Sequence, residues 1–161
     1  MSRDATDRSG PRDFVTVMIG AQLFGLPIES VHDVFVVEAL TRVPLARPEI
    51  AGVLNLRGRI VTAIDLRRRL ALDSLDGARK PMAVGIERRG EAFGLIVDQV
   101  GDVLRLGQDA REPNPPNLDR RWAEVADGVC RLERDLMIVL DVDRVLALGS
   151  EAGHRERGEA A

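Results

Sequence analysis

The sequence predicts an all-β protein with short helices, built from two similar small barrels packed together. Two observations carry this prediction. One folding unit occurs twice along the chain, and most apolar runs are short, rich in β-branched residues and separated by polar turns. Closure into barrels is expected because it removes the exposed edges of such small sheets. The 161 residues suffice for one domain or for two very small lobes.

The repeat becomes visible when the chain is aligned with itself. Residues 25–34 match residues 94–103, and residues 52–72 match residues 128–148, at offsets of 69 and 76 positions. Apolar patterning alone does not require several of the identical residues. These are the pairs Gly25/Gly94, Gly52/Gly128, Asp33/Asp102, Asp65/Asp141 and Arg68/Arg144. The sequence therefore predicts a duplicated, pseudo-symmetric unit.

Within each copy, at about 14–72 and about 83–148, the apolar runs predict β-hairpins. Three stretches each divide into two apolar runs about a polar or glycine-containing turn. These stretches are 14–28, 52–66 and 83–97, with turns at 20–22, 57–58 and 88–91. We expect four or five strands in each copy, and therefore one barrel subdomain from each copy.

Helical spacing is confined to two short segments. Val31, Val34 and Phe35 recur at helical spacing, and Leu66 and Leu70 lie four positions apart around a run of arginines. We expect a short helix at each of these two places and strands in most of the remaining repeat.

Composition and charge favour a cytoplasmic protein. The net charge is only −3, so no overall basic field would recruit phosphate backbones or anionic lipid. The single cysteine, Cys130, cannot form an internal disulfide, which fits a reducing compartment. No apolar run approaches the roughly 18 residues of a membrane span, and no apolar signal core follows the N-terminus. The polar ends, 1–12 and 150–161, are expected to be disordered tails around a single domain at 13–149.

The chain offers few residues for catalysis or for metal binding. Two histidines, His32 and His154, are too few for a multi-histidine site, and Cys130 has no CxxC companion. Ser30, His32 and Asp33 are near neighbours in the sequence, so their side chains point apart and cannot form a triad. Neither phosphate-binding glycine motif is present. The sequence thus predicts no enzyme activity, no cofactor and no metal.

One basic cluster, Arg67 to Arg69, keeps a second class of function open. A small barrel with a basic edge could bind single-stranded nucleic acid, and that mode of binding uses aromatic stacking platforms. The chain has no tyrosine, one tryptophan and four phenylalanines, most of which lie in strand patterns. Nucleic-acid binding is therefore the alternative hypothesis, which a salt-dependent shift with oligonucleotides would test.

A specific family resemblance lies in the duplicated segment. Residues 52–61 read GVLNLRGRIV and residues 63–67 read AIDLR, which closely resembles the signature of the CheW-like family. These proteins couple chemoreceptors to the histidine kinase CheA in chemotaxis signal transduction. Supporting blocks occur in the same order at 24–28, 94–98 and 137–141, and the resemblance covers about 14–148. It implies two SH3-like five-stranded barrels and a stand-alone, non-catalytic adaptor.

The resemblance also implies where a receptor would bind. Asn55, Arg57 and Gly58 would form a hairpin near the receptor contact, and Val31 and Val34 would help line the adjoining groove. The acidic residue expected to pair with the arginine of the hairpin is Glu38. In the second copy the corresponding turn reads LERD at 132–135, so the two barrels are not interchangeable.

The implied partners are a kinase and a receptor. Phe35, Val36 and Val37 form a candidate apolar surface for the regulatory domain of a CheA-type histidine kinase. The cytoplasmic tips of methyl-accepting chemoreceptors would recruit the protein to arrays at the inner face of the membrane, without direct membrane insertion. Within this class, an adaptor of a chemosensory pathway that does not control motility is a further alternative.

Overall fold

The computed structural model of the chain describes residues 10–72 and 81–147, and the structural statements below concern these residues. Most of them belong to strands. The strands are β1 (Arg12–Ile19), β2 (Gln22–Pro27), β3 (Asp33–Val36), β4 (Ile50–Leu56), β5 (Arg59–Asp65), β6 (Met82–Arg88), β7 (Glu91–Val97), β8 (Gln99–Leu106), β9 (Arg111–Glu112), β10 (Ala126–Arg131) and β11 (Leu136–Leu140). The helices are η1 (Ile28–Ser30), α2 (Leu66–Arg69), η2 (Gln108–Ala110), α3 (Arg120–Ala123) and residues 142–147.

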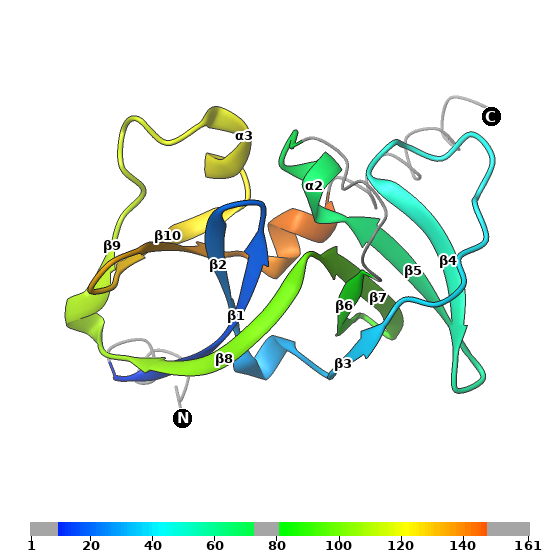
Figure 1. The fold of residues 1–161 in the computed structure, drawn as a ribbon, viewed down its shortest axis with the longest axis horizontal. Coiled ribbons are helices and arrows are strands. Elements are labelled where there is room, and N and C mark those ends of the chain that lie inside the picture. The colour runs from blue at the N-terminus through cyan, green and yellow to red at the C-terminus, as the bar shows by residue number, and fades with distance from the viewer. Residues whose placement is uncertain (1–9, 73–80, 148–161) are drawn as a thin grey trace.

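The strands form two sheets that lie side by side and curl into barrels (Figure 1). The first barrel has the strand order β8-β1-β2-β11-β10-β9, and the second has the order β3-β6-β7-β5-β4. Neighbouring strands are antiparallel, except that β11 is parallel to β2 and β5 is parallel to β7. The predicted all-β fold of two small barrels is confirmed. The first barrel gains a sixth strand, the two-residue β9.

The two barrels do not coincide with the two copies of the repeat, which corrects the expectation that 14–72 and 83–148 each form one. The first barrel combines β1 and β2 of the first copy with β8 to β11 of the second. The second barrel combines β3 to β5 of the first copy with β6 and β7 of the second. Because the copies present equivalent edges, their strands can pair between copies as well as within one.

The pairing itself is nevertheless symmetric, which supports the duplication. In the first barrel Ile138 of β11 pairs with Phe24 of β2, and in the second Thr62 of β5 pairs with Phe93 of β7. The repeat offsets map one pair onto the other. The matched aspartates also act alike, since Asp65 accepts a hydrogen bond from the Arg67 amide while Asp141 accepts one from the Arg144 amide.

The largest apolar core lies between the two barrels, because it takes one face of strands from both sheets. In β11, Ile138 and Leu140 join this shared core, whereas Met137 and Val139 belong to a smaller cluster with Phe14 inside the first barrel. Consecutive residues of a strand face opposite sides, so β11 separates the two cores. The shared core holds residues of both barrels in one folding unit. They include Val17, Ile19, Phe24, Leu26, Ile64, Leu66, Val84, Ile86, Leu95 and Val97.

The two expected helices have different outcomes. The helix around Leu66 and Leu70 is confirmed, since α2 begins at Leu66 and both leucines are buried. The helix expected through Val31, Val34 and Phe35 is wrong: only η1 is helical there, and the chain is extended from Asp33 onward. The reason is tertiary, because β6 offers an antiparallel partner that places Val34 opposite Val84.

Of the segments expected to be tails, 1–12 and 150–161, the structure describes only residues 10–12. Arg12 is the first residue of β1 and pairs with Leu106 of β8, so the first strand starts one residue before the expected domain. Residues 1–9 and 148–161 lie outside the described residues. Among the described helices, none has the length and the apolar character that a membrane span requires.

Candidate functional site

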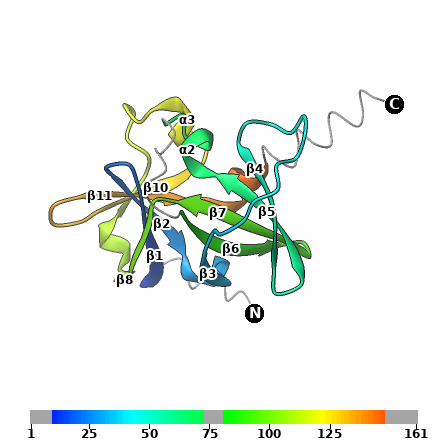
Figure 2. The ribbon, with the colours of Figure 1, turned by 45° about the vertical axis from the view of Figure 1, so that its right-hand side comes forward.

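The turn between β4 and β5 presents an arginine at the end of a projecting hairpin (Figure 2). Arg57 and Gly58 both have positive φ angles, 54° and 81°, as a type I′ turn requires. The Asn55 side chain fixes the turn, because its Oδ1 accepts a hydrogen bond from the Gly58 amide at 2.9 Å. The predicted hairpin is thereby confirmed. A non-glycine residue in this backbone region costs about 1 kcal/mol or more, and Arg57 occupies it with its side chain largely in solvent.

The guanidinium of Arg57 reaches Asp33 at the start of β3. The distance from Nη1 to the Asp33 Oδ2 is 3.4 Å, and the Arg57 side chain is 77% exposed. This pair replaces the expected pairing of Arg57 with Glu38, which is exposed beyond the end of β3. The physical reason is Gly85, which pairs with Asp33 across β3 and β6. A Cβ atom at Gly85 would clash with the Asp33 carboxylate, so glycine leaves the space that this carboxylate occupies.

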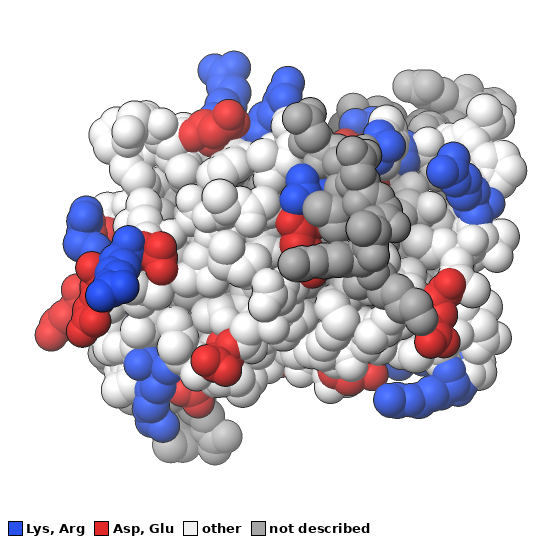
Figure 3. All heavy atoms as spheres, in the orientation of Figure 1, with Lys and Arg blue, Asp and Glu red and all other residues white. Residues whose placement is uncertain are grey.

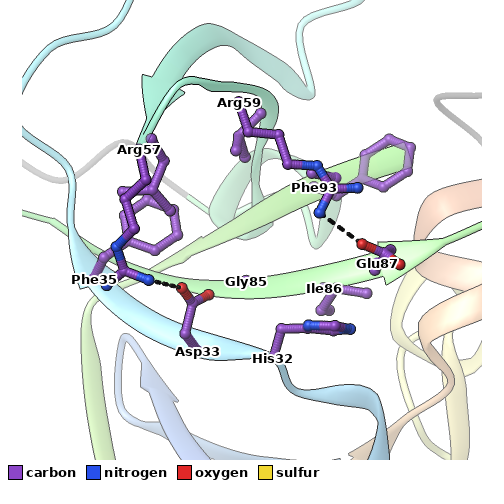
Figure 4. A pocket seen from close by; sticks show the side chains of 12 residues that line it. His32, Asp33, Phe35, Arg57, Arg59, Gly85, Ile86, Glu87 and Phe93 are labelled. Atoms are coloured by element: carbon purple, nitrogen blue, oxygen red, sulfur yellow. Dashed lines mark hydrogen bonds and ion pairs between the residues drawn. The ribbon is translucent and has the colours of Figure 1, made fainter. Parts of the chain in front are cut away.

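A cavity of about 260 Å³ opens between β3, the hairpin and the β6–β7 pair (Figure 4). Two ion pairs cross it: Arg57 with Asp33, and Arg59 with Glu87 at 2.6 Å. The hydrogen bond from Arg59, with its positive charge, lowers the pKa of the Glu87 carboxyl below its usual value. The cavity therefore has a charged mouth. Its lining residues are His32, Asp33, Phe35, Leu56, Arg57, Arg59, Val61, Gly85, Ile86, Glu87, Ala92 and Phe93.

The floor of the cavity is apolar, and Phe35 supplies much of it. The Phe35 ring lies against Gly94, where a Cβ atom would be only 3.2 Å from Cζ. Strand alternation thus splits the candidate kinase surface: Phe35 faces into the barrel, Val36 is exposed on the other face, and Val37 is buried. An unbroken apolar surface of three residues is not present there.

The exposed valines of β3 lie at the margin of the seam between the barrels. Val34 is 39% exposed and Val36 is 42% exposed. Their antiparallel partners, Val84 and Met82, pack in or against the shared core. Val31, expected in the same groove, is half-buried against that core. The structure therefore brings Val31 and Val34 to the seam. It places Arg57 at the cavity on the other side of β3, and Asn55 and Gly58 lie in the turn that carries Arg57.

One exposed residue at this seam was missed by reasoning from the sequence. Val103 of β8 is 52% exposed and occupies the position equivalent to Val34 at the repeat offset of 69. It pairs with Val15 of β1 as Val34 pairs with Val84 of β6. Carrying Val34 over to the second copy would have identified it.

The three arginines of the basic cluster do not form one surface. Arg67 binds Asp98 and Arg68 pairs with Asp65, whereas Arg69 is buried and donates to the carbonyl oxygen of Arg144 at 3.3 Å. Burial lowers the pKa of the Arg69 guanidinium. On the face shown in Figure 3, basic and acidic side chains are interspersed. In the part of the chain that the structure describes, no group of three or more metal-ligating side chains comes together.

Comparisons with known proteins agree with this architecture. The family model described as the CheW-like domain matches residues 13–149. The probable chemotaxis protein CheW of Rhizobium etli is 26% identical over 141 residues, which span 86% of this chain and 89% of that protein. The chemotaxis protein CheW of Bacillus subtilis is 27% identical over 132 residues, or 82% and 85% of the two chains.

A solved structure extends the agreement to three dimensions. The crystal structure of the scaffolding protein TtCheW from Thermoanaerobacter tengcongensis matches with a TM-score of 0.73 and 28% identity. The match covers 81% of this chain and 89% of that one, and the two barrels are therefore the SH3-like pair of this fold. With two barrels in the same arrangement and a family match from residue 13 to residue 149, the chain belongs to the CheW-like domain family.

Proposed function

We propose that this protein is a non-catalytic scaffold that couples methyl-accepting chemoreceptors to a CheA-type histidine kinase. Family membership supports the scaffold role, since the relatives are named as chemotaxis proteins and one as a scaffolding protein. The observation that carries the site is the arginine hairpin held beside an exposed valine. Arg57 is positioned by Asp33 at one side of β3, and Val34 is exposed on the other.

This surface suits a partner that combines apolar side chains with a carboxylate. The Arg57–Asp33 pair is long and solvent-exposed, so it contributes little by itself and a partner's carboxylate can compete for the guanidinium. Val34 supplies apolar area for the same partner, and its equivalent on the other barrel, Val103, is exposed as well. We assign this combined surface to the cytoplasmic tip of the receptor.

The kinase contact needs a different surface. Val37 is buried and Phe35 lines the cavity, so of the three candidate residues only Val36 can reach a partner without rearrangement. We therefore keep Val36 alone in the proposed kinase contact. Recruitment by receptors would hold this cytoplasmic protein at the inner face of the membrane.

The proposed mechanism is geometric, because a scaffold acts through binding and not through bond chemistry. A scaffold that binds receptor and kinase at once transmits a signal when a change in receptor geometry favours one arrangement of the kinase. Its contribution is the difference in binding free energy between those arrangements. Binding of nucleic acid finds no support, because Arg67, Arg68 and Arg69 each engage a different group of the protein.

The test compares two arginines in the same type of turn. Arg57→Ala removes the proposed receptor contact, and Arg89→Ala is the matched control, since Arg89 precedes Gly90 in the β6–β7 turn with a φ angle of 52°. We expect Arg57→Ala to weaken receptor-dependent kinase activation by about tenfold, as for an arginine that dominates an interface. Kinase pull-down should be unchanged. Equal activation by both variants in a reconstituted receptor array would contradict the assignment.

A further inference from the structure

The two barrels are held together by an apolar core and are joined by the chain at two places in the described residues. The chain passes from the first barrel to the second through 28–32, and back at Asp98 between β7 and β8. The shared core supplies cohesion and close packing. Hydrogen bonds add direction, such as those from Trp122 Nε1 to the Leu70 carbonyl oxygen and from Arg69 Nε to the Val145 carbonyl oxygen. Directional contacts at the crossings act where the chain itself passes between the barrels, so they bear directly on the angle between them.

The crossing at Asp98 is tied to both barrels by one carboxylate. Arg67 of α2, which follows β5 of the second barrel, donates from Nε to Oδ1 at 2.7 Å and from Nη2 to Oδ2 at 2.5 Å. The amide of Gly20, in the β1–β2 turn of the first barrel, donates to the same carboxylate at 2.7 Å. The Asp98 amide also donates to the Met18 carbonyl oxygen at 3.1 Å. Bidentate pairing of this kind fixes orientation as well as distance.

The other crossing is held in a looser way. At the repeat offset, Asp98 corresponds to Glu29, which pairs with Arg12 through a single contact of 2.8 Å. The Glu29 side chain is 62% exposed, whereas those of Arg67 and Asp98 are each only 15% exposed. An exposed single contact constrains little, so the Asp98 crossing is the one that is firmly fixed.

The crossings lead directly into the strands that carry the proposed receptor surface. β3 begins after the first crossing and presents Val34, and β8 begins immediately after Asp98 and presents Val103. A change in the angle between the barrels would therefore alter the relative positions of these two valines. The Asp98 crossing is placed to keep that spacing constant.

We propose that Arg67 and Asp98 are positioning residues that lock the angle between the two barrels, and that this fixed angle is needed to pass a receptor signal to the kinase. The second clause rests on the proposed function. The lock touches neither partner surface directly, but the proposed receptor surface takes Val34 from one barrel and Val103 from the other. Loss of the lock should therefore weaken receptor binding and leave the kinase contact on β3 intact. What its loss removes is the fixed spacing of Val34 and Val103 within the receptor surface.

The test compares variants that remove the Arg67–Asp98 ion pair with a variant that removes an ion pair inside one barrel. Arg67→Met and the double variant Arg67→Met with Asp98→Asn open the lock, and the asparagine avoids an unpaired buried charge. Arg131→Met is the matched control, because Arg131 also binds a carboxylate with two contacts, to Glu112, but within the first barrel. Thermal unfolding establishes that each variant is folded.

Two readouts separate the lock from the proposed function. The first is the distance between two spin labels, measured by pulsed electron paramagnetic resonance. The labels are attached at Leu45→Cys in the second barrel and at Glu133→Cys in the first. The native Cys130 is buried, so the labels react with the introduced cysteines. The second is receptor-dependent kinase activation in a reconstituted array. We expect both lock variants to broaden or shift the distances and to lower activation by about tenfold, within the usual range of coupling between sites. Kinase binding in a pull-down should be retained, whereas receptor binding should weaken.

Each outcome decides one statement. Distances identical to those of the control variant would overturn the lock, whatever the activity. Altered distances with full activation would overturn the need for a fixed angle. If the wild-type protein fails to couple receptor and kinase, the proposed function fails, and the distance measurement still decides the lock.

Discussion

Gly52→Ala should strongly destabilise the base of the arginine hairpin. Gly52 has a φ angle of 153°, and a Cβ atom there would clash with the carbonyl oxygen of Thr41. That oxygen is backbone and takes part in a two-bond bridge, in which Thr41 and Val53 each donate to the other at 2.8 Å. Loss of both hydrogen bonds costs about 2 kcal/mol. Backbone strain adds about 1–2 kcal/mol, so the free energy of unfolding should fall by about 3–4 kcal/mol.

Urea unfolding measures this loss of stability, and two further glycine variants serve as a second test and a control. With a slope of about 1–3 kcal/mol per molar, the midpoint should fall by at least about 1 M. Gly128→Ala, at the equivalent position in the second copy, should lose a similar amount, because its Cβ atom would lie 2.7 Å from the Glu112 carbonyl oxygen. Gly107→Ala is the control, since no atom lies within 4 Å of its Cβ position. A Gly52→Ala midpoint equal to that of Gly107→Ala would refute the argument.

Two other predictions concern the cavity. Gly85→Ala should change the free energy of unfolding by no more than about 1 kcal/mol, because the ion pair that it disturbs is exposed. It should nevertheless displace the Asp33 carboxylate and lower receptor-dependent kinase activation toward the level of Arg57→Ala. Full activation with a displaced Asp33 would contradict this prediction. Glu87 contributes stability above its unfolded pKa, and this is lost as the pH falls through its lowered folded pKa. A carboxyl NMR titration should show the low midpoint, and Arg59→Met should raise it. An ordinary Glu87 midpoint in the wild type would be inconsistent with the pairing.

The local chemistry of the chain allowed much of the fold to be predicted. Turn residues such as Arg57-Gly58 determine a hairpin within a few positions, so the strand pairs followed from short-range signals. The exchange of strands between barrels could not follow, because the two copies carry the same pattern and nothing local says which copy pairs with which. β3 was misread for a related reason: its apolar residues fit helical spacing, and only the partner strand β6 decides the conformation.

The ion pair at the arginine hairpin was predicted in part. The sequence pointed to Arg57 and to an acidic partner for its side chain. Two acidic residues, Asp33 and Glu38, lie in or near β3, and the sequence did not show which of them pairs with Arg57. Asp33 is the partner because Gly85 stands opposite it, and this pairing depends on the register of β3 against β6. Val103 was missed although the repeat itself relates it to Val34. Tertiary register, and not residue type, supplied the missing information.

The duplication helps to separate structural from functional differences between the copies. Arg69 and Val145 are equivalent by the repeat offset, and they meet across the pseudo-twofold axis, where Arg69 Nε donates to the Val145 carbonyl oxygen at 3.4 Å. Two arginines there would place like charges together in a buried site, so the two copies have to differ at this position.

No such constraint acts at the hairpin turns. Arg57 and its equivalent, Glu133, lie in the tips of different barrels, and both are exposed to solvent. Folding therefore does not demand that the first copy has NLRG at 55–58 where the second has RLER at 131–134. A difference that the fold does not require, at an exposed and locally strained position, is best explained by a partner that recognises the hairpin turn of the second barrel and not that of the first.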